Sequence, residues 1–117
     1  MIVKLETHFD AAHYLPNYEG KCSRMHGHTY RLIVEVEGKP NPKTGMVIDF
    51  SILKDIINEH ILIYLDHQIL NAVIKNPTAE NIATWIKEKL INSGYFDNFK
   101  INVTVYEGLN NSASTGW

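Results

Sequence analysis

The stretch His28-Thr29-Tyr30-Arg31-Leu32-Ile33-Val34-Glu35-Val36-Glu37-Gly38 decides the fold class of this chain. Its apolar side chains recur at every second residue, which is the period of a half-buried β-strand. Residues 2–13 and 100–107 follow the same pattern. A short apolar segment at 46–50 predicts a further strand, which would pair back on the quoted stretch after a Pro-rich turn. The sequence therefore predicts a sheet of four strands.

Two segments between these strands have helical spacing. Ser51 can cap the first, and Thr78 opens the second, which Gly94 ends. The predicted order is β-β-β-α-α-β, which indicates an α+β protein: a four-stranded antiparallel sheet with two helices packed on one face. A sheet of this size leaves open edges, which must be covered, blunted or paired with another subunit.

The composition excludes several classes of function. The chain has 117 residues, which predicts a single domain over residues 1–117. Its formal net charge is −2, so the domain lacks the overall excess of positive charge that is typical of nucleic-acid-binding proteins. We expect a cytoplasmic protein, because there is no apolar run of membrane-spanning length and no signal-peptide pattern. A single cysteine, Cys22, cannot form a disulfide within the chain.

Three histidines have the spacing of a metal site. His26 and His28 lie two residues apart at the start of the quoted strand, so their side chains point to the same face. His13 lies at the end of the first predicted strand, which can run beside the second. Three neutral imidazoles suit Zn²⁺ and leave a fourth position for water or substrate, as in catalytic zinc sites. His8 and His60 have no partners at such spacing, so we expect them to be structural or surface residues.

Cys22 lies in the long predicted loop 14–27, close to the histidine pair, and Lys21 and Arg24 flank it. Nearby cations favour the thiolate form of a cysteine. A thiolate beside zinc could take a proton from a carbon next to a zinc-bound oxygen. It could equally be a fourth zinc ligand, which would make the site structural, or an inert small side chain.

Two carboxylates, a histidine and a threonine are further candidates, each with an ordinary structural explanation. Asp66 could orient the imidazole of His67, as in relay arrangements, or the two could form an exposed turn. Glu107, at the end of the last strand, could accept two N–H donors from an amidine-like ring edge, or be solvated. Thr78 and Glu80 are explained as a helix cap and a first-turn acid.

In combination, these motifs resemble the 6-pyruvoyl-tetrahydropterin synthase superfamily over nearly the whole chain. The segments that carry the resemblance are Phe9-Asp10-Ala11-Ala12-His13, Cys22-Ser23-Arg24-Met25-His26-Gly27-His28, Gly45-Met46-Val47-Ile48-Asp49-Phe50, Leu65-Asp66-His67-Gln68-Ile69-Leu70-Asn71, Pro77-Thr78-Ala79-Glu80-Asn81 and Val105-Tyr106-Glu107. The spacer of three residues between Cys22 and the His-Gly-His pair resembles the 6-carboxy-tetrahydropterin synthase branch of queuosine and deazapurine biosynthesis. Pyruvoyl-forming members typically have a longer spacer, and folate-branch paralogs typically carry Glu in place of Cys22.

The resemblance implies an activity and roles for the central residues. His13, His26 and His28 would hold zinc, and Cys22 would be the general base. The implied enzyme converts 7,8-dihydroneopterin triphosphate to 6-carboxy-5,6,7,8-tetrahydropterin, acetaldehyde and triphosphate, and reduces the ring at the expense of the side chain. Alternatives on the same site are a pyruvoyl-forming activity and a folate-branch aldolase-like activity. More distant are a non-enzymatic structural-zinc module and a cysteine hydrolase, which would leave the three histidines unexplained.

The resemblance also implies a subunit arrangement. Asp66 and His67 would form a relay pair that reaches the site from a neighbouring subunit, while Glu107 and Thr78 would bind the pterin. The implied architecture is the tunnelling fold, which pairs sheet edges between subunits and typically gives a hexamer of two trimers with sites at subunit interfaces. The tail 108–117 departs from the family's usual ending.

Overall fold

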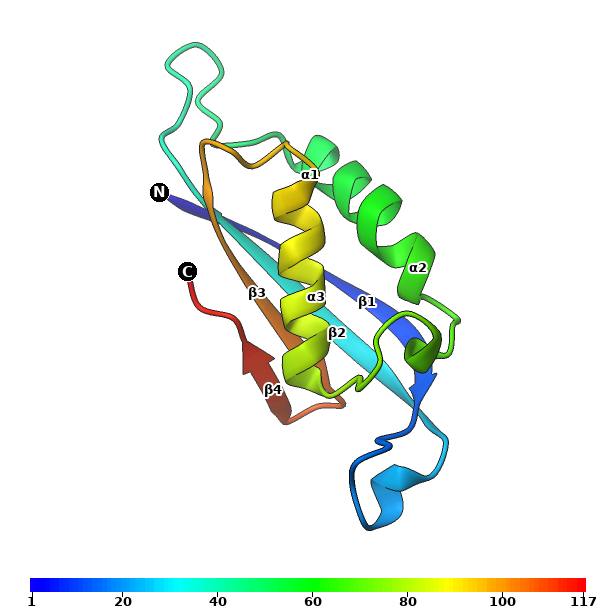
Figure 1. Cartoon of the computed structure of the whole chain (residues 1–117). Coiled ribbons are helices and arrows are strands. Elements are labelled where there is room, and N and C mark those ends of the chain that lie inside the picture. The colour runs from blue at the N-terminus through cyan, green and yellow to red at the C-terminus, as the bar shows by residue number, and fades with distance from the viewer.

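The alternating segments pair into one antiparallel sheet in the computed structural model, which describes residues 1–117 (Figure 1). The strands lie side by side in chain order: β1 (Ile2–His13), β2 (His26–Glu37), β3 (Lys100–Glu107) and β4 (Asn111–Ser114). Each pair of neighbours is antiparallel. Alternation therefore predicted the first, second and last of the expected strands within a few residues of their bounds.

The predicted strand at 46–50 is wrong. The Asp49 carboxylate accepts the backbone N–H of Ser51 at 2.8 Å, so Asp49 is the N-cap of the first helix. Val47 is buried against the core while the backbone around it turns toward the helix. A helix cap at the end of so short an apolar run leaves no length for pairing with β2.

The fourth strand comes instead from the tail of the chain. The N-terminus of β4 pairs with the end of β3 through Glu107 and Asn111, and the three residues between them make the turn. Gly108 has a φ of 73°, which a residue without a side chain adopts at little cost. The segment 111–114 is polar and carries no apolar alternation, so its pairing was not predicted from the sequence.

The two predicted helical segments are confirmed. The first begins as α1 (Phe50–Ile57), continues through a π-helical turn at Asn58–Leu62 and ends as α2 (Ile63–Leu65). The second is α3 (Ala79–Asn92), and the Thr78 hydroxyl oxygen accepts the backbone N–H of Asn81 as its N-cap. Short 3₁₀ turns lie at Lys21–Ser23 and Leu70–Ala72.

Both helical segments cover the same face of the sheet. α3 lies over β3, and the α1–α2 segment lies over β1 (Figure 1). The core is formed by alternate strand residues and one stripe of each helix, and its most deeply buried members include Phe9, Tyr30, Leu32, Val34, Leu53, Ile57, Ile61, Leu65, Ile82, Ile86, Leu90, Val103 and Val105. These side chains fix which residues of each strand face the helices and which face away.

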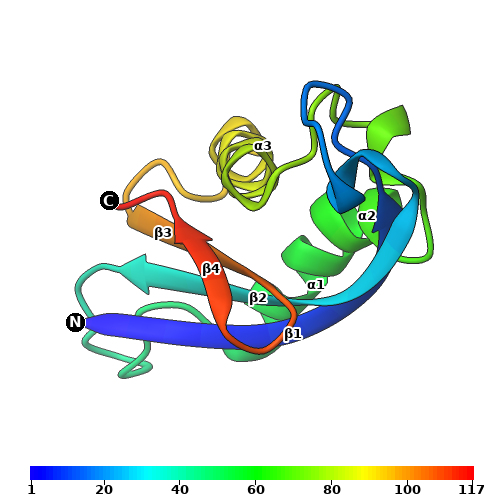
Figure 2. The same ribbon diagram turned by 90° about the horizontal axis from the view of Figure 1, so that it is seen from below.

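The opposite face of the sheet has polar side chains and no helix over it. Arg31 of β2 bonds to Glu6 of β1 at 3.2 Å, and its guanidinium lies 3.9 Å from the centre of the Tyr106 ring. Within one chain, β1 and β4 are the two edge strands of the sheet. Figure 2 shows α3 on one side of β3 and β4. Neither edge strand has a further strand beside it, although residues 66–69 bond to the end of β1 at Asp10 and Ala12. No helix is long and apolar enough to cross a membrane.

Candidate metal centre and active site

The three histidines singled out in the sequence converge at one end of the sheet. His13 and His26 are directly paired across β1 and β2, and His28 pairs with Ala11 two residues further along. The imidazole centres lie 4.6, 5.2 and 4.8 Å apart for the pairs 13–26, 13–28 and 26–28. The side chain of Glu107 joins them, and one donor atom from each of the four residues lies within 4.8 Å of the others.

Backbone carbonyls orient two of the imidazoles. Nδ1 of His13 lies 2.7 Å from the Pro77 carbonyl, and Nδ1 of His26 lies 2.7 Å from the Arg24 carbonyl. A carbonyl oxygen only accepts, so each Nδ1 carries the proton and each neutral ring keeps a lone pair on Nε2. The two Nε2 atoms are 3.0 Å apart. Two lone pairs at that distance can share one metal ion, and carbonyl-oriented imidazoles are typical of metal sites.

The environment of His28 also favours the neutral, metal-binding form. Burial lowers the pKa of His28, the neighbouring His13 and His26 lower it further, and Glu107 opposes both effects. Its Nε2 lies 3.1 Å from a Glu107 carboxylate oxygen. Together with the donor geometry of the other two rings, this shows that the cluster can hold a divalent metal ion.

Glu107 and Thr78, predicted as substrate-binding residues, line one pocket of about 410 Å³ beside the cluster. The Thr78 hydroxyl oxygen accepts the N–H of Asn81, and its own proton stays available for a ligand. Leu15 and Ser112 complete part of the wall. The contribution of Ser112 was missed because β4 was not predicted from the sequence.

Tyr30 lies beneath the cluster and was read from the sequence only as a strand residue. Its ring stacks on Phe9 at 4.9 Å and lies 5.9 and 5.5 Å from the rings of His13 and His28. Its hydroxyl is buried without a hydrogen-bond partner, and burial raises the pKa of Tyr30, with Glu107 adding to the effect. The aromatic layer shields the inner side of the histidines from water.

Asp66 and His67 form the pair considered from the sequence. Nδ1 of His67 lies 3.1 Å from an Asp66 carboxylate oxygen. The other oxygen accepts the backbone N–H of Asp10, which is the main reason the pKa of Asp66 lies below its usual value, with His67 contributing. His67 has a φ of 58°, unusual for a residue with a side chain, and its side chain is 78% exposed. The pair is anchored, with an imidazole that projects into solvent.

This pair lies at the outer edge of β1, bonded to the backbone of Asp10, and it forms a group separate from its own chain's metal cluster. Asp10 follows the alternation of β1 and is exposed, whereas the next residue, Ala11, is buried opposite His28. The donor atoms of Asp10, Asp66 and His67 lie within 4.8 Å of one another, so the pair sits on the Asp10 side. Successive strand residues point to opposite faces, so the Asp10 side chain beside the pair points away from the face that carries the ligand His13.

Cys22 lies in the 3₁₀ turn Lys21–Ser23, half-buried, and its carbonyl accepts the N–H of Leu15 at 2.8 Å. Its thiol is not among the donor atoms that cluster with the histidines. The fold therefore does not place Cys22 as the fourth ligand of a closed metal site. His8 and His60 also lie outside the cluster.

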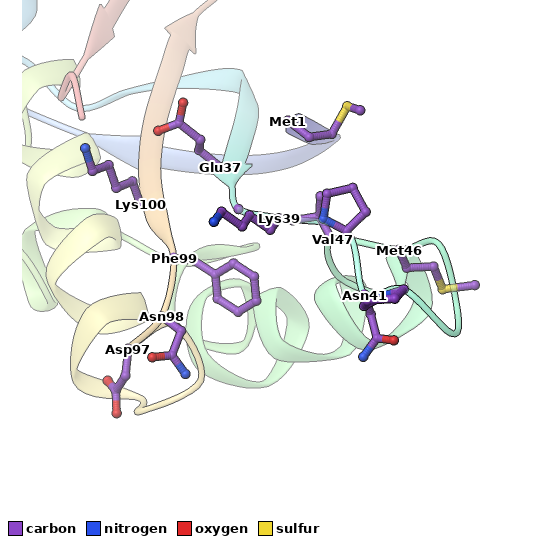
Figure 3. A pocket seen from close by; sticks show the side chains of 13 residues that line it. Met1, Glu37, Lys39, Asn41, Met46, Val47, Asp97, Asn98, Phe99 and Lys100 are labelled. Atoms are coloured by element: carbon purple, nitrogen blue, oxygen red, sulfur yellow. The ribbon is translucent and has the colours of Figure 1, made fainter.

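The largest surface pocket lies at the other end of the sheet (Figure 3). It has a volume of about 940 Å³, and its lining includes Met1, Glu37, Lys39 and Phe99. It contains no histidine or cysteine, and none of the candidate site residues. Because chemistry needs positioned donors rather than volume alone, the histidine end is the candidate active site.

Comparison with known proteins finds relatives with similar sequence and fold. The chain is 43% identical over 99 residues to 6-carboxy-5,6,7,8-tetrahydropterin synthase of Synechocystis, covering 80% of this chain and 77% of the relative. It is 45% identical over 82 residues to dihydroneopterin monophosphate aldolase of Pyrococcus furiosus, covering 70% of this chain and 68% of the relative. The structure of 6-pyruvoyl tetrahydropterin synthase of Caenorhabditis elegans superposes with a TM-score of 0.82 at 28% identity, over 100% of this chain and 96% of that one.

The family assignment rests on nearly the whole length of the chain. Residues 2–116 match the sequence pattern of the 6-pyruvoyl tetrahydropterin synthases. The strands, the helices and the histidine cluster all lie inside that range. This chain therefore belongs to the 6-pyruvoyl tetrahydropterin synthase family.

Proposed function

We propose that this protein is a zinc-dependent lyase that converts 7,8-dihydroneopterin triphosphate and one water molecule to 6-carboxy-5,6,7,8-tetrahydropterin, with release of acetaldehyde and triphosphate. The convergence of three imidazoles and Glu107 beside a pocket that also contains Thr78 carries the proposal. The relative in Synechocystis is named for this product. The reaction would belong to the queuosine and deazapurine branch of pterin chemistry.

Zinc suits the donor set. In tetrahedral zinc sites the Zn–N distance is about 2.0–2.1 Å, which puts neighbouring donors roughly 3.3 Å apart. The shortest donor contacts here are 3.0 Å between His13 and His26 and 3.1 Å between His28 and Glu107. When bound, zinc would supply a Lewis acid that polarises the oxygens of the substrate side chain.

Glu107 and Thr78 would orient the pterin. The 2-amino group and N3 of the ring present two parallel N–H donors, which a carboxylate accepts in the bidentate geometry that gives strong, directional contacts. The free proton of the Thr78 hydroxyl can be donated to a ring acceptor. Both residues line the same pocket, so they can act on one ligand. Their contacts would fix the reacting side chain over the histidines.

Cys22 would remove the carbon-bound proton, and the Asp66–His67 pair would move protons on the other side of the substrate. The carboxylate of Asp66, held ionised by its hydrogen bonds, stabilises the charged form of His67. The pair is not part of its own chain's cluster and lies at the edge of β1, so it would serve the site of a second copy. We therefore propose a homo-oligomer assembled through the open edges β1 and β4, with a hexamer of two trimers as the expected form.

The similarity to the Pyrococcus furiosus aldolase favours one alternative. An aldolase would break a side-chain carbon–carbon bond by a retro-aldol step, which leaves the oxidation level of the ring unchanged. The lyase proposed here instead reduces the ring from dihydro to tetrahydro. Folate-branch paralogs typically carry Glu in place of Cys22, so the cysteine favours the lyase.

Product analysis with 7,8-dihydroneopterin triphosphate tests the proposal. We expect acetaldehyde and a tetrahydropterin carboxylate from the zinc-loaded protein, and no turnover after chelation. Ser23→Ala, in the same turn as Cys22, should retain activity and serves as the matched control for Cys22→Ala. A product with an intact three-carbon side chain, or a ring still at the dihydro level, would reject the proposed reaction.

A further inference from the structure

Glu107 has a donor position in the cluster that a substrate anchor alone does not need. Its carboxylate lies with the three imidazole nitrogens inside a group whose members are all within 4.8 Å. Three histidines and one carboxylate make a complete set of four ligands for a tetrahedral ion. The side chains of His28 and Glu107 are 25% and 27% exposed, so water reaches this corner only partly.

The contact between His28 and Glu107 is close without being a hydrogen bond. The two atoms are 3.1 Å apart, yet the buried Nε2 of His28 has no partner in hydrogen-bond geometry. The N–H or lone-pair direction of the ring therefore misses the carboxylate oxygen. Two donors that lie near one another without pointing at each other have the arrangement of neighbouring ligands around a shared ion.

Glu107 also borders the pocket that contains Thr78. It lies at the end of β3, directly across from Tyr30 on β2, so its backbone is held between two paired strands. A bidentate contact with a pterin edge uses both carboxylate oxygens. The same side chain cannot make that contact and remain a full metal ligand.

We propose that Glu107 exchanges partners: its carboxylate is the fourth ligand of the metal while the pocket is empty, and it leaves the metal when it binds the pterin edge. This rests on the proposed function, because it takes the pterin as ligand of the pocket. The exchange would open a coordination position only when a ring is bound and its side chain lies over the histidines. An empty site would stay closed to other ligands.

Zinc affinity of the purified protein tests the exchange without reference to turnover. The dissociation constant is measured by competition with a chromophoric chelator, for the wild type and Glu107→Gln, with and without 6-methylpterin, which carries the ring edge but no side-chain hydroxyls. Glu37→Gln is the matched control, since Glu37 ends β2 at the opposite end of the sheet. Oligomer size and circular dichroism confirm that each variant is folded.

We expect Glu107→Gln to weaken zinc binding at least about tenfold, because even outer partners of a metal site change affinity by roughly 10–100-fold. We expect 6-methylpterin to weaken zinc binding to the wild type by roughly fivefold or more, and to have no effect on Glu107→Gln. Unchanged affinity in Glu107→Gln, or no effect of 6-methylpterin on the wild type, would overturn the exchange. The proposed function would fail separately, through the absence of acetaldehyde from the wild type.

Discussion

Replacing His13 should cost the metal-free protein much more stability than replacing His26, although both changes should abolish metal binding. His13 is fully buried, and its Nδ1–H donates to the Pro77 carbonyl at 2.7 Å in a buried setting. His26 is partly exposed and donates to the exposed carbonyl of Arg24. Removal of the His13 side chain therefore leaves a buried carbonyl without a donor, whereas removal of the His26 side chain leaves a carbonyl that water can reach.

The magnitude follows from those contacts. His13→Ala leaves a buried carbonyl without a donor, which costs about 1–3 kcal/mol, and a cavity that costs about 1 kcal/mol more. We expect a loss of about 2–4 kcal/mol in the free energy of unfolding, or roughly 8–16 °C in melting temperature at about 4 °C per kcal/mol. Water can replace the bond lost in His26→Ala, so its cost should stay below about 1 kcal/mol.

Urea denaturation in the presence of chelator measures this difference. All samples must share one protein concentration, because assembly contributes to apparent stability. Metal content by mass spectrometry, measured before chelation, should be near zero for both variants. Equal stability of the two metal-free variants would show that the contact between His13 and Pro77 does not contribute to the free energy of unfolding. Zinc retained by His13→Ala would refute the proposed set of ligands.

Further predictions concern the proposed base Cys22, the effect of Asp66 and His28 on stability at low pH, and the packing of Gly38 at the far end of the sheet. Cys22→Ala should retain zinc but lose roughly 10²–10⁴-fold in activity, which metal analysis and product assays check together. Asp66 has a pKa lowered from about 3.8, so its contribution to stability is present above that pH and lost as the pH falls through the folded value; Asp66→Asn should flatten this acid limb in a pH series of melting curves. The lowered pKa of His28 means that the metal-free protein should lose stability as the pH falls below about 6.5, where the unfolded chain binds the proton first, and that His28→Asn should reduce this slope. Gly38→Ala would place a Cβ 2.7 Å from the Phe99 ring, so denaturation should show a loss of about 1–3 kcal/mol, whereas Phe99→Ala in the same background should relieve the clash.

The strand and helix pattern was predictable because it reflects local chemistry. Alternation over 28–38 places Leu32 and Val34 on one face whatever the partner strand is. Thr78 caps α3 by accepting the backbone N–H of Asn81, only three residues later in the chain. The prediction failed where local signals were ambiguous. The apolar run at 46–50 is compatible with a strand. Asp49 caps a helix there only because the turn that follows it packs on the sheet. The polar β4 forms only because β3 offers it an edge.

The sequence alone determined the donor types and their spacing. His26 and His28 share a face by strand geometry, and that property needs no knowledge of the remaining chain. Only the tertiary structure decided which distant side chains join them. The register between β1 and β2 places His13 beside His26, and the register between β2 and β3 places Glu107 next to the same cluster. The turn before α3 supplies the Pro77 carbonyl that orients His13. Pairing of residues 66–69 with the outer edge of β1 also placed Asp66 and His67 beside Asp10, apart from the histidine cluster, because the backbone groups of an edge strand are free to bond to a passing segment.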